Sequence, residues 1–382
     1  MDYELLRLAA KGDVARLDEI LQMQCRDTFA GKFPETLKTE GFRFPSLLVA
    51  QQATSDALAA YHARLAEPGM KVLDMTLGLG IDSFAFARRG AEVTAFDLDE
   101  NKVVAARDNA ALMGLTVDAR QGDSVEWLQQ TSETYDIIFA DPARRSTQGR
   151  KLYALSDCMP DVTGQNLKLI RAHCRTLIVK ASPMCDVSKL RLDLQDERAD
   201  IHITAVKGEC KELLAVSPGT GRLTVYEASD DSEYTFTEED LSLPVAYLAD
   251  VADIAQMTLA EPTAPIMKAQ VFGWLCQRYG AVMADRNTHI AFLRSVKGPM
   301  PADLFAVRAV YPFSKEGIRQ VRQCVGDRAE VAVRNFPLKA DDLRKRLGIR
   351  DGGAAAGNPV RIYGLTIGGK KLLLVTEPRP GA

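Results

Sequence analysis

Residues 71–82, KVLDMTLGLGID, constrain the fold of this chain more than any other stretch. They predict a short strand that ends at Asp74, followed by a turn that contains Gly78 and Gly80 and then by a helix. Glycine tolerates the positive φ angles of such a turn and lets a ligand approach the backbone closely. The segment therefore predicts a strand–turn–helix unit of an α/β sheet with a ligand pocket at the end of the strand.

A glycine-rich turn does not identify its ligand, because such turns are common in doubly wound folds. A dinucleotide-dependent dehydrogenase would usually carry a third glycine, where this chain has Ser83. The residues that follow the next predicted strands are therefore needed to distinguish between possible ligands.

Those strands also end near acidic residues. Strand 91–96 leads to Asp97, about twenty residues after the glycine turn, where a carboxylate can accept hydrogen bonds from ribose hydroxyls. Strand 116–120 leads to Asp123, for which an ordinary surface turn is the alternative interpretation. Acids at these two points favour a nucleoside ligand.

The fourth predicted strand, residues 135–140, is nearly continuous apolar sequence, as expected for a strand buried on both faces. It is followed by Asp141-Pro142-Ala143-Arg144-Arg145. Polar residues at the carboxyl end of such a strand are placed to contact a ligand.

Together these segments resemble the nucleotide-site motifs of the class I S-adenosylmethionine (SAM) methyltransferases. The resemblance implies SAM as cofactor, bound by Asp74, Gly78, Gly80, Asp97 and Asp123, with Asp123 near the adenine amino group. It also implies an α/β fold, with a Rossmann-like, mostly parallel sheet of seven strands. An N-terminal helical segment would precede the sheet, and a small α+β region would follow it.

The Asp141-Pro142 pair resembles the amino-methylating branch of that family, in which Asp or Asn is followed by two prolines and an aromatic residue. The resemblance implies that the carboxylate accepts hydrogen bonds from an exocyclic NH2 group. This chain has Ala143 and Arg144 at the last two positions. Arginine can stack on a base or bind phosphate, although a solvated loop or a structural ion pair is the alternative. We therefore expect Asp141, Pro142 and Arg144 to form the acceptor side.

Two further segments are candidates for this site. Lys180, at the end of predicted strand 176–180, is expected to hold a phosphate or to orient Asp141; a capping or surface lysine is the alternative. Residues 51–55 occupy the place where related enzymes often form a lid over the cofactor, although an ordinary packing helix is the favoured explanation.

Cysteine and histidine usage argues against a metal site. The seven cysteines form no CxxC pair, and the four histidines do not cluster with them. Residues 139–147 contain no cysteine, which disfavours methylation of a pyrimidine at carbon 5. No run of eighteen apolar residues exists, and the first residues are acidic rather than basic. We predict a cytoplasmic protein without a membrane segment.

The carboxyl-terminal region is basic. Residues 268–382 contain 20 Lys plus Arg and 9 Asp plus Glu, a net charge of +11, so the preceding residues carry −14 of the total of −3. This asymmetry favours an anionic partner, although a solvated basic face is the alternative.

Segments 333–338 (VRNFPL), 343–347 (LRKRL) and 364–371 (GLTIGGKK) resemble the bacterial THUMP-like carboxyl-terminal domain, and residues 305–320 resemble the ferredoxin-like unit before it. THUMP domains bind RNA, so the resemblance implies RNA as the partner. The basic residues that would line one phosphate-binding face are Arg334, Lys339, Arg344, Lys345, Arg346, Lys370 and Lys371.

The predicted organisation has five parts: a helical region (1–66), the methyltransferase domain (67–230), a helical connector (231–300), a ferredoxin-like unit (301–332) and a THUMP-like basic domain (333–382). The predicted function is SAM-dependent methylation of RNA, with a base amino nitrogen favoured. Two alternatives stay open: a small-molecule or protein acceptor, and a non-catalytic protein that binds SAM and RNA.

Overall fold

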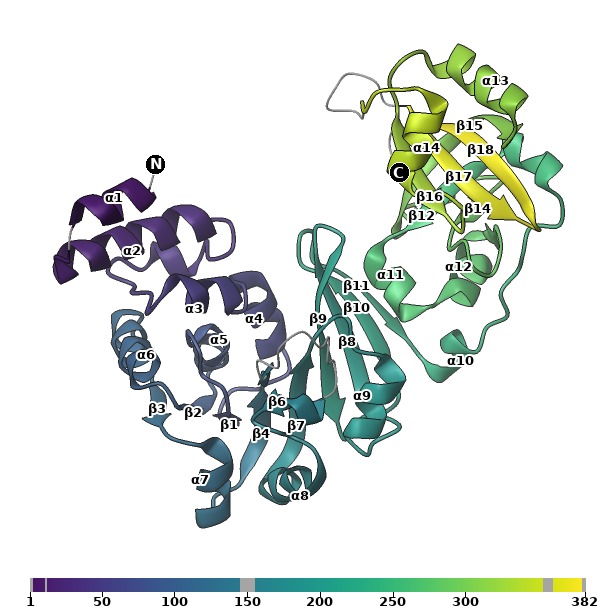
Figure 1. Cartoon of the computed structure of the whole chain (residues 1–382). Helices are drawn as coiled ribbons and strands as arrows, with labels where there is room; N and C mark the ends of the chain where they lie inside the picture. The colour runs from purple at the N-terminus through teal and green to yellow at the C-terminus, as the bar shows by residue number, and fades with distance from the viewer. Residues whose placement is uncertain (1–2, 11, 145–154, 353–359, 380–382) are drawn as a thin grey trace. The chain divides into compact units, whose positions relative to one another are not determined.

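The computed structural model describes residues 3–10, 12–144, 155–352 and 360–379. The chain divides into two compact units, Met1–Tyr234 and Thr235–Ala382, and each is built around a β-sheet (Figure 1).

The first unit opens with helices: α1 (Tyr3–Ala10), α2 (Val14–Phe29), η1 (Thr36–Lys38), α3 (Leu47–Gln52) and α4 (Asp56–Ala63). Asp13, Ser46 and Ser55 accept hydrogen bonds from the first-turn N–H groups of α2, α3 and α4, which fixes where these helices begin. Apolar side chains of this region, Phe33 among them, belong to the same core cluster as strand residues. The expected helical region 1–66 is therefore part of the sheet's own domain.

The first sheet has nine strands in the order β11-β10-β8-β9-β7-β4-β1-β2-β3. They are β1 (Lys71–Asp74), β2 (Glu92–Asp97), β3 (Val117–Gln121), β4 (Tyr135–Ala140), β7 (Cys174–Ala181), β8 (Asp200–Val206), β9 (Glu209–Ser217), β10 (Leu223–Glu227) and β11 (Ser232–Phe236). Neighbours from β3 to β7 pair in parallel, whereas β9 is antiparallel to both β7 and β8. The mostly parallel α/β sheet is confirmed, with two strands more than the seven expected.

Helices cover both faces of this sheet (Figure 1). They are α5 (Ile81–Arg88), α6 (Glu100–Leu112), α7 (Ser124–Gln130), α8 (Gly164–His173) and α9 (Val187–Asp193); η2 (Leu155–Asp157) and a small ladder of β5 (Ala143–Arg144) with β6 (Cys158–Met159) lie between β4 and α8. Val72 and Ile137 face the core shared with α4, α5 and α6, while their neighbours Leu73 and Ile138 are completely buried on the other face. Because β1 lies between β2 and β4, the strand order reverses there, and a ligand crevice is expected at that point.

The second unit carries a seven-stranded sheet in the order β13-β14-β12-β15-β18-β17-β16. Its elements are α10 (Glu238–Leu241), η3 (Val251–Gln256), β12 (Thr258–Pro262), α11 (Ala264–Ala269), α12 (Phe272–Tyr279), β13 (Val282–Met283), β14 (Ala291–Leu293), β15 (Ala302–Pro312), α13 (Lys315–Val325), β16 (Glu330–Arg334), α14 (Ala340–Leu347), β17 (Arg361–Ile367) and β18 (Lys370–Pro378).

The long strand β15 serves both faces of this sheet. A register shift between Val307 and Ala309 changes which side chains point to each side. Phe305 and Val307 pack in one apolar cluster, whereas Ala309 and Tyr311 pack in the other, which α13 and α14 cover. One strand thereby joins two cores into a single unit.

Two of the predicted boundaries are corrected here. Residues 231–300 are not a helical connector, because β11 ends the first sheet and β12, β13 and β14 extend the second. The expected units 301–332 and 333–382 are not separate, because β15 pairs with β18 and β16 pairs with β17 in one sheet. Strands of two to five residues show too few alternations to be recognised from sequence, and their pairing is decided by distant partners.

Candidate active site

The carboxyl ends of the parallel strands open into a cavity of about 1790 Å³ in the first unit. Its wall includes the turn after β1, the ends of β2, β3, β4 and β7, and residues 51–55. Pockets for one small ligand usually measure about 300–1,000 Å³. This cavity therefore has room for a cofactor and for part of a second molecule.

The glycine turn after β1 forms as predicted. Gly78 and Gly80 have φ angles of 56° and 87°, and Gly80 is the N-cap of α5. A Cβ atom at Gly80 would lie 2.6 Å from the ring of Phe84, so only glycine fits the turn without displacing that ring. The backbone N–H of Gly78 donates to Asp97 Oδ2 at 3.0 Å, which ties the turn to the end of β2.

Asp97 lines the cavity, where a ribose diol would require it. Its carboxylate accepts hydrogen bonds from the N–H groups of Gly78 and Asp99 and forms an ion pair with Lys102 at 3.2 Å. These donors fix the position of the carboxylate at the cavity wall.

We expect Asp97→Ala to weaken SAM binding at least tenfold, since a hydrogen bond to a charged group contributes about 1.5–3 kcal/mol. Isothermal titration with SAM measures the change. Asp118→Ala, which removes an exposed carboxylate on β3 that pairs with Arg120, is the matched control and should leave the affinity unaltered. Equal affinities of Asp97→Ala and wild type would remove the ribose assignment.

The other two acids of the predicted cofactor site have backbone-supporting roles. Asp74 is 1% exposed and accepts hydrogen bonds from Ser83 Oγ at 2.6 Å and from the N–H of Thr76 at 2.9 Å, and burial raises its pKa to about 7. It supports the glycine turn from behind the cavity wall. Asp123 lines the cavity, and its Oδ1 caps α7 by accepting from the N–H of Val125 at 2.7 Å.

Asp141 occupies the acceptor side of the cavity, together with Pro142 and Ala143. Its N–H donates to Thr76 Oγ1 at 2.8 Å, and its Oδ2 lies 2.6 Å from Lys180 Nζ. The Asp141 side chain is nevertheless 38% exposed, so part of the carboxylate faces the cavity. Lys180 therefore contacts Asp141, as one of its predicted roles requires.

Of the two predicted arginines, the structure describes only the backbone of Arg144. The backbone of Arg144 pairs with Cys158 in the β5–β6 ladder, which places it one residue beyond the cavity-lining Ala143. The side chain of Arg144 and the whole of Arg145 lie outside the described residues. The proposed contact of Arg144 with the acceptor therefore stays a prediction.

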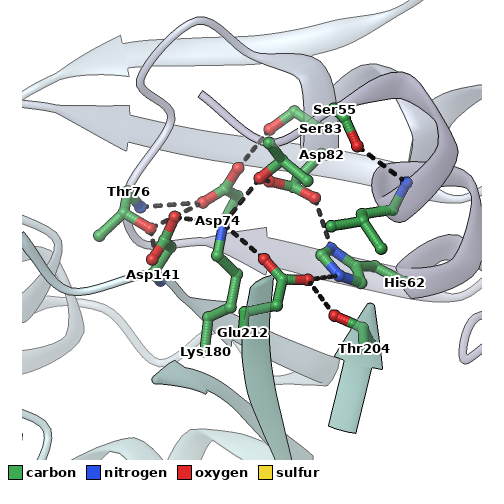
Figure 2. Close-up of polar contacts among 12 residues, drawn as sticks. Ser55, His62, Asp74, Thr76, Asp82, Ser83, Asp141, Lys180, Thr204 and Glu212 are labelled. Carbon is green, nitrogen blue, oxygen red and sulfur yellow. Dashed lines mark hydrogen bonds and ion pairs between the residues drawn. The ribbon is translucent and has the colours of Figure 1, made fainter. Parts of the chain in front are cut away.

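Five side chains form a closed cycle of hydrogen bonds and ion pairs behind Asp141, which we call the buried network (Figure 2). Lys180 Nζ contacts Thr54 Oγ1 at 2.7 Å and Glu212 Oε2 at 3.3 Å. His62 joins Glu212 Oε1 at 2.6 Å to Asp82 Oδ1 at 2.7 Å. Thr54 closes the cycle by donating to Asp82 Oδ2 at 2.5 Å. All five residues are less than 9% exposed.

The buried network balances charge below the protein surface. Burial lowers the pKa of His62, but Glu212 and Asp82 raise it to about 9. Burial raises the pKa of Glu212, but Lys180 and His62 lower it to about 2. Burial likewise disfavours charged Lys180, yet Asp141 and Glu212 raise its pKa above the ordinary value. Near neutral pH, the network therefore holds two cations against the carboxylates around them.

Sequence reasoning did not identify His62, Asp82 and Glu212 as site residues. Their elements α4, α5 and β9 are separated along the chain, so no local spacing links them. The one signal was Glu212 at the start of the apolar run 213–215, because a charged residue there needs a partner. Thr54 fell within the predicted covering segment 51–55, and all five residues of that segment line the cavity.

The seven basic residues predicted to bind RNA fall into two groups. Arg334 is half-buried and pairs with Glu261, which also contacts Arg361 and Tyr363, so it is used inside the second unit. Arg344 pairs with Asp341 at 2.6 Å. The exposed members are Lys339, Lys345, Arg346, Lys370 and Lys371.

The exposed basic residues come from two neighbouring places. Arg346 on α14 stacks over the ring of Phe313 at 5.1 Å, and the N–H of Phe313 donates to the carbonyl of Lys371 at 2.8 Å. The last turn of α14 and the start of β18 therefore lie side by side, and together they present Lys345, Arg346, Lys370 and Lys371.

The described residues offer neither a metal site nor a helix that could span a membrane. They contain no group of three or more His, Cys, Asp or Glu side chains arranged to hold a metal ion. None of their helices combines the length and the apolar composition needed to cross a membrane.

Comparisons with known proteins follow the same division of the chain. A methyltransferase domain family matches residues 72–154, and a THUMP domain-like family matches residues 302–378. An uncharacterized SAM-dependent methyltransferase of Mycobacterium tuberculosis is 26% identical over 331 residues, which is 85% of each chain. The THUMP-like match spans both units that were predicted as separate, residues 301–332 and 333–382.

A solved structure assigned as a methyltransferase, from Porphyromonas gingivalis W83, has a TM-score of 0.81 and 28% identity, covering 95% of this chain and 90% of that one. A ubiquinone biosynthesis O-methyltransferase of Hahella chejuensis is 37% identical over 75 residues, which is 20% of this chain and 32% of that one. The similarity to the Porphyromonas gingivalis structure extends over nearly the whole chain, whereas the similarity to the Hahella chejuensis enzyme is confined to a short segment.

Proposed function

The chain is a SAM-dependent methyltransferase with a carboxyl-terminal THUMP-like domain, and from that premise we propose that it methylates RNA at a base amino nitrogen. The observation that carries the proposal is the Asp141-Pro142 pair, which lines the same cavity as the glycine turn of the cofactor site. A carboxylate at that point can accept a hydrogen bond from an amino group and hold its nitrogen toward the methyl donor.

The residues around the turn fit SAM. The positive φ angles of Gly78 and Gly80 leave the backbone open to close approach, and Asp97 offers carboxylate oxygens for a ribose. Asp123 and exposed Leu98 line the same part of the cavity, where an adenine would follow the ribose. Residues 51–55 also line this cavity.

SAM, held by the turn at Gly78 and Gly80 and by Asp97, would supply an electrophilic methyl group to the acceptor nitrogen, which would then release a proton to water. The chain's own residues supply alignment. Asp141 and the carbonyl of Pro142 orient the amino group, and Thr76 holds the backbone of Asp141. Because alignment of the reacting groups removes much of the entropic cost, no acid–base residue is required at the nitrogen.

The exposed basic residues of α14 and β18 support RNA as the acceptor. Lys345, Lys370 and Lys371 take no part in the two apolar clusters of the second unit, and Arg346 adjoins one of them by stacking over Phe313. Four cations close together favour a phosphate backbone, and contacts of this kind bind by releasing counterions. The surface would position RNA by shape and charge rather than by reading its sequence.

We expect the double variant Lys370→Ala/Lys371→Ala to bind RNA more weakly and less salt-dependently. Each lost phosphate contact should reduce the slope of log K against log [salt] by about 0.7 for single strands. Fluorescence anisotropy with labelled RNA at several salt concentrations measures the slope. Arg319→Ala, which removes a cation on α13 already paired with Glu316, is the control. An unchanged slope in the double variant would exclude this surface.

Transfer of radiolabelled methyl groups from SAM to total RNA tests the proposal. Label in RNA, followed by digestion to nucleosides and identification of an N-methylated amino base, is the expected result. Label in a purified protein or small-molecule fraction, with none in RNA, would overturn it. That result would favour the other acceptor class, for which the large cavity also has room.

We place this activity in the cytoplasm. All seven cysteines are free thiols, which fits a reducing compartment, and an RNA acceptor would be available there.

A further inference from the structure

We propose that Lys180 is the positioning residue of the acceptor site: it anchors one oxygen of Asp141 so that the rest of the carboxylate faces the acceptor. The identity of the acceptor rests on the proposed function, whereas the role of Lys180 rests on the geometry of the site. Lys180 Nζ lies 2.6 Å from Asp141 Oδ2, and 38% of the Asp141 side chain remains exposed.

The Lys180 ammonium is itself fixed in direction. A protonated lysine has three N–H donors, and three acceptors surround this one: Asp141 Oδ2, Thr54 Oγ1 at 2.7 Å and Glu212 Oε2 at 3.3 Å. The acceptors come from three separate parts of the chain: Asp141 follows β4, Thr54 precedes α4 and Glu212 lies on β9. With every donor used, rotation of the ammonium would break a contact, so Asp141 is held at one place.

The rest of the buried network keeps Lys180 available for Asp141. Glu212 lies close to His62 at 2.6 Å as well as to Lys180, so a second cation shares its charge. Asp82 Oδ1 lies 2.7 Å from the other ring nitrogen of His62, and Asp82 Oδ2 accepts a hydrogen bond from the Thr54 hydroxyl. Lys180 is therefore not the sole partner of any buried carboxylate. Thr54 belongs to residues 51–55, so the buried network also connects that segment to Asp141 on the acceptor side of the cavity.

This arrangement indicates which acceptors suit the site. A carboxylate is a weak base toward a hydroxyl group, but it readily accepts hydrogen bonds. The lone pair of an exocyclic amine is delocalised into the base, and hydrogen bonds from its N–H groups to a fixed carboxylate help to localise it on the nitrogen, so that methyl transfer can precede loss of the proton. A hydroxyl would need a base to remove its proton. The Lys180–Asp141 pair therefore favours amine acceptors over hydroxyl acceptors.

Amide hydrogen exchange of the SAM complex tests the positioning role without reference to the acceptor. Lys180→Met should speed exchange at the Asp141 N–H, with α8 as the internal reference, and Lys180→Arg should restore part of the protection. Lys189→Met, which breaks an exposed ion pair with Asp193 on α9, is the matched control. Unchanged exchange at Asp141 in Lys180→Met would overturn the proposal.

A double-mutant cycle on the transfer rate tests whether Lys180 acts through Asp141. Lys180→Met should lower kcat about 100-fold with little change in the dissociation constant for SAM. In an Asp141→Ala background the same change should cost less than about threefold, because the residue it positions is gone. Additive losses, or lost SAM binding, would overturn the role. If Lys180→Met does not fold, Thr54→Val and Lys180→Arg carry the same comparison.

The two tests separate this inference from the proposed acceptor. Accelerated exchange at Asp141 with no methyl transfer to RNA by the wild type would retain the role of Lys180 and reject RNA. Methyl transfer to RNA by the wild type with an unaltered rate in Lys180→Met would retain RNA and reject the role of Lys180.

Discussion

Replacing Asp141 with alanine should lower the rate of methyl transfer to RNA about 100-fold, while the affinity for SAM stays within about twofold of wild type. The reason is geometric. Asp141 lies on the acceptor side of the cavity, and its exposed carboxylate is the group placed to orient an amino nitrogen. Without that hydrogen bond the acceptor loses its alignment with the methyl donor, whereas the turn at Gly78 and Gly80 is unaffected.

The Asp141→Ala protein should remain folded. Lys180 keeps Glu212 and Thr54 as partners, so no buried charge is left alone. Asp136→Ala is the matched control, because Asp136 lies on β4, the strand that Asp141 follows, and contacts Lys71 and Arg175. Single-turnover measurements with labelled SAM give the rate, and titration gives the affinity. A rate for Asp141→Ala above about one third of wild type would remove Asp141 from the acceptor site.

Replacing His62 with leucine should lower the free energy of unfolding by about 3 kcal/mol or more, the usual cost of removing one partner from a buried ion pair. His62 is completely buried and separates two carboxylates, Asp82 and Glu212, at 2.7 Å and 2.6 Å. In the variant these carboxylates would face each other across an apolar side chain. Denaturant unfolding measures the change, and His173→Leu, at a half-buried histidine bonded to the carbonyl of Glu133, is the control.

The pH dependence of stability should identify His62 as the group responsible. The folded protein raises the pKa of His62 from 6.5 to about 9, so its stabilisation is fully present below pH 6.5 and is lost as the pH rises through 9. The difference in unfolding free energy between wild type and His62→Leu should therefore shrink across that interval. Asp74 also titrates there, but it is present in both proteins and largely cancels in the difference. A constant difference from pH 6 to 10 would show that His62 is not charged in the folded state.

The cofactor half of the site could be predicted because its signals are local. Asp74, Gly78 and Gly80 lie within one strand–turn–helix unit, and Asp97 follows the next strand. Each depends on the conformation of a few neighbouring residues, which the sequence specifies directly. The structure changed the interpretation of Asp74, which lies behind the cavity wall rather than on it.

The acceptor half could be predicted only in part. The Asp141-Pro142 pair is a contiguous motif, and the position of Lys180 at a strand end suggested a link between them. What holds Lys180 could not be read from the chain, because Glu212 and His62 are 150 residues apart and neither belongs to a recognisable motif. Ion pairing over that separation is decided by the packing of α4 against the sheet.

The carboxyl-terminal half separates the two kinds of information in another way. Its positive charge is a property of composition, and the sequence alone determined it, along with the strand–turn–helix motif and the parallel strands β1–β4 and β7 of the first sheet. Only the tertiary structure decided that β12, β13 and β14 join one sheet with β15–β18, and that Arg334 pairs inward with Glu261 while Lys370 and Lys371 stay exposed. The physical reason is that local conformation depends on adjacent residues, whereas strand pairing, burial and charge pairing depend on which distant segments the folded chain brings together.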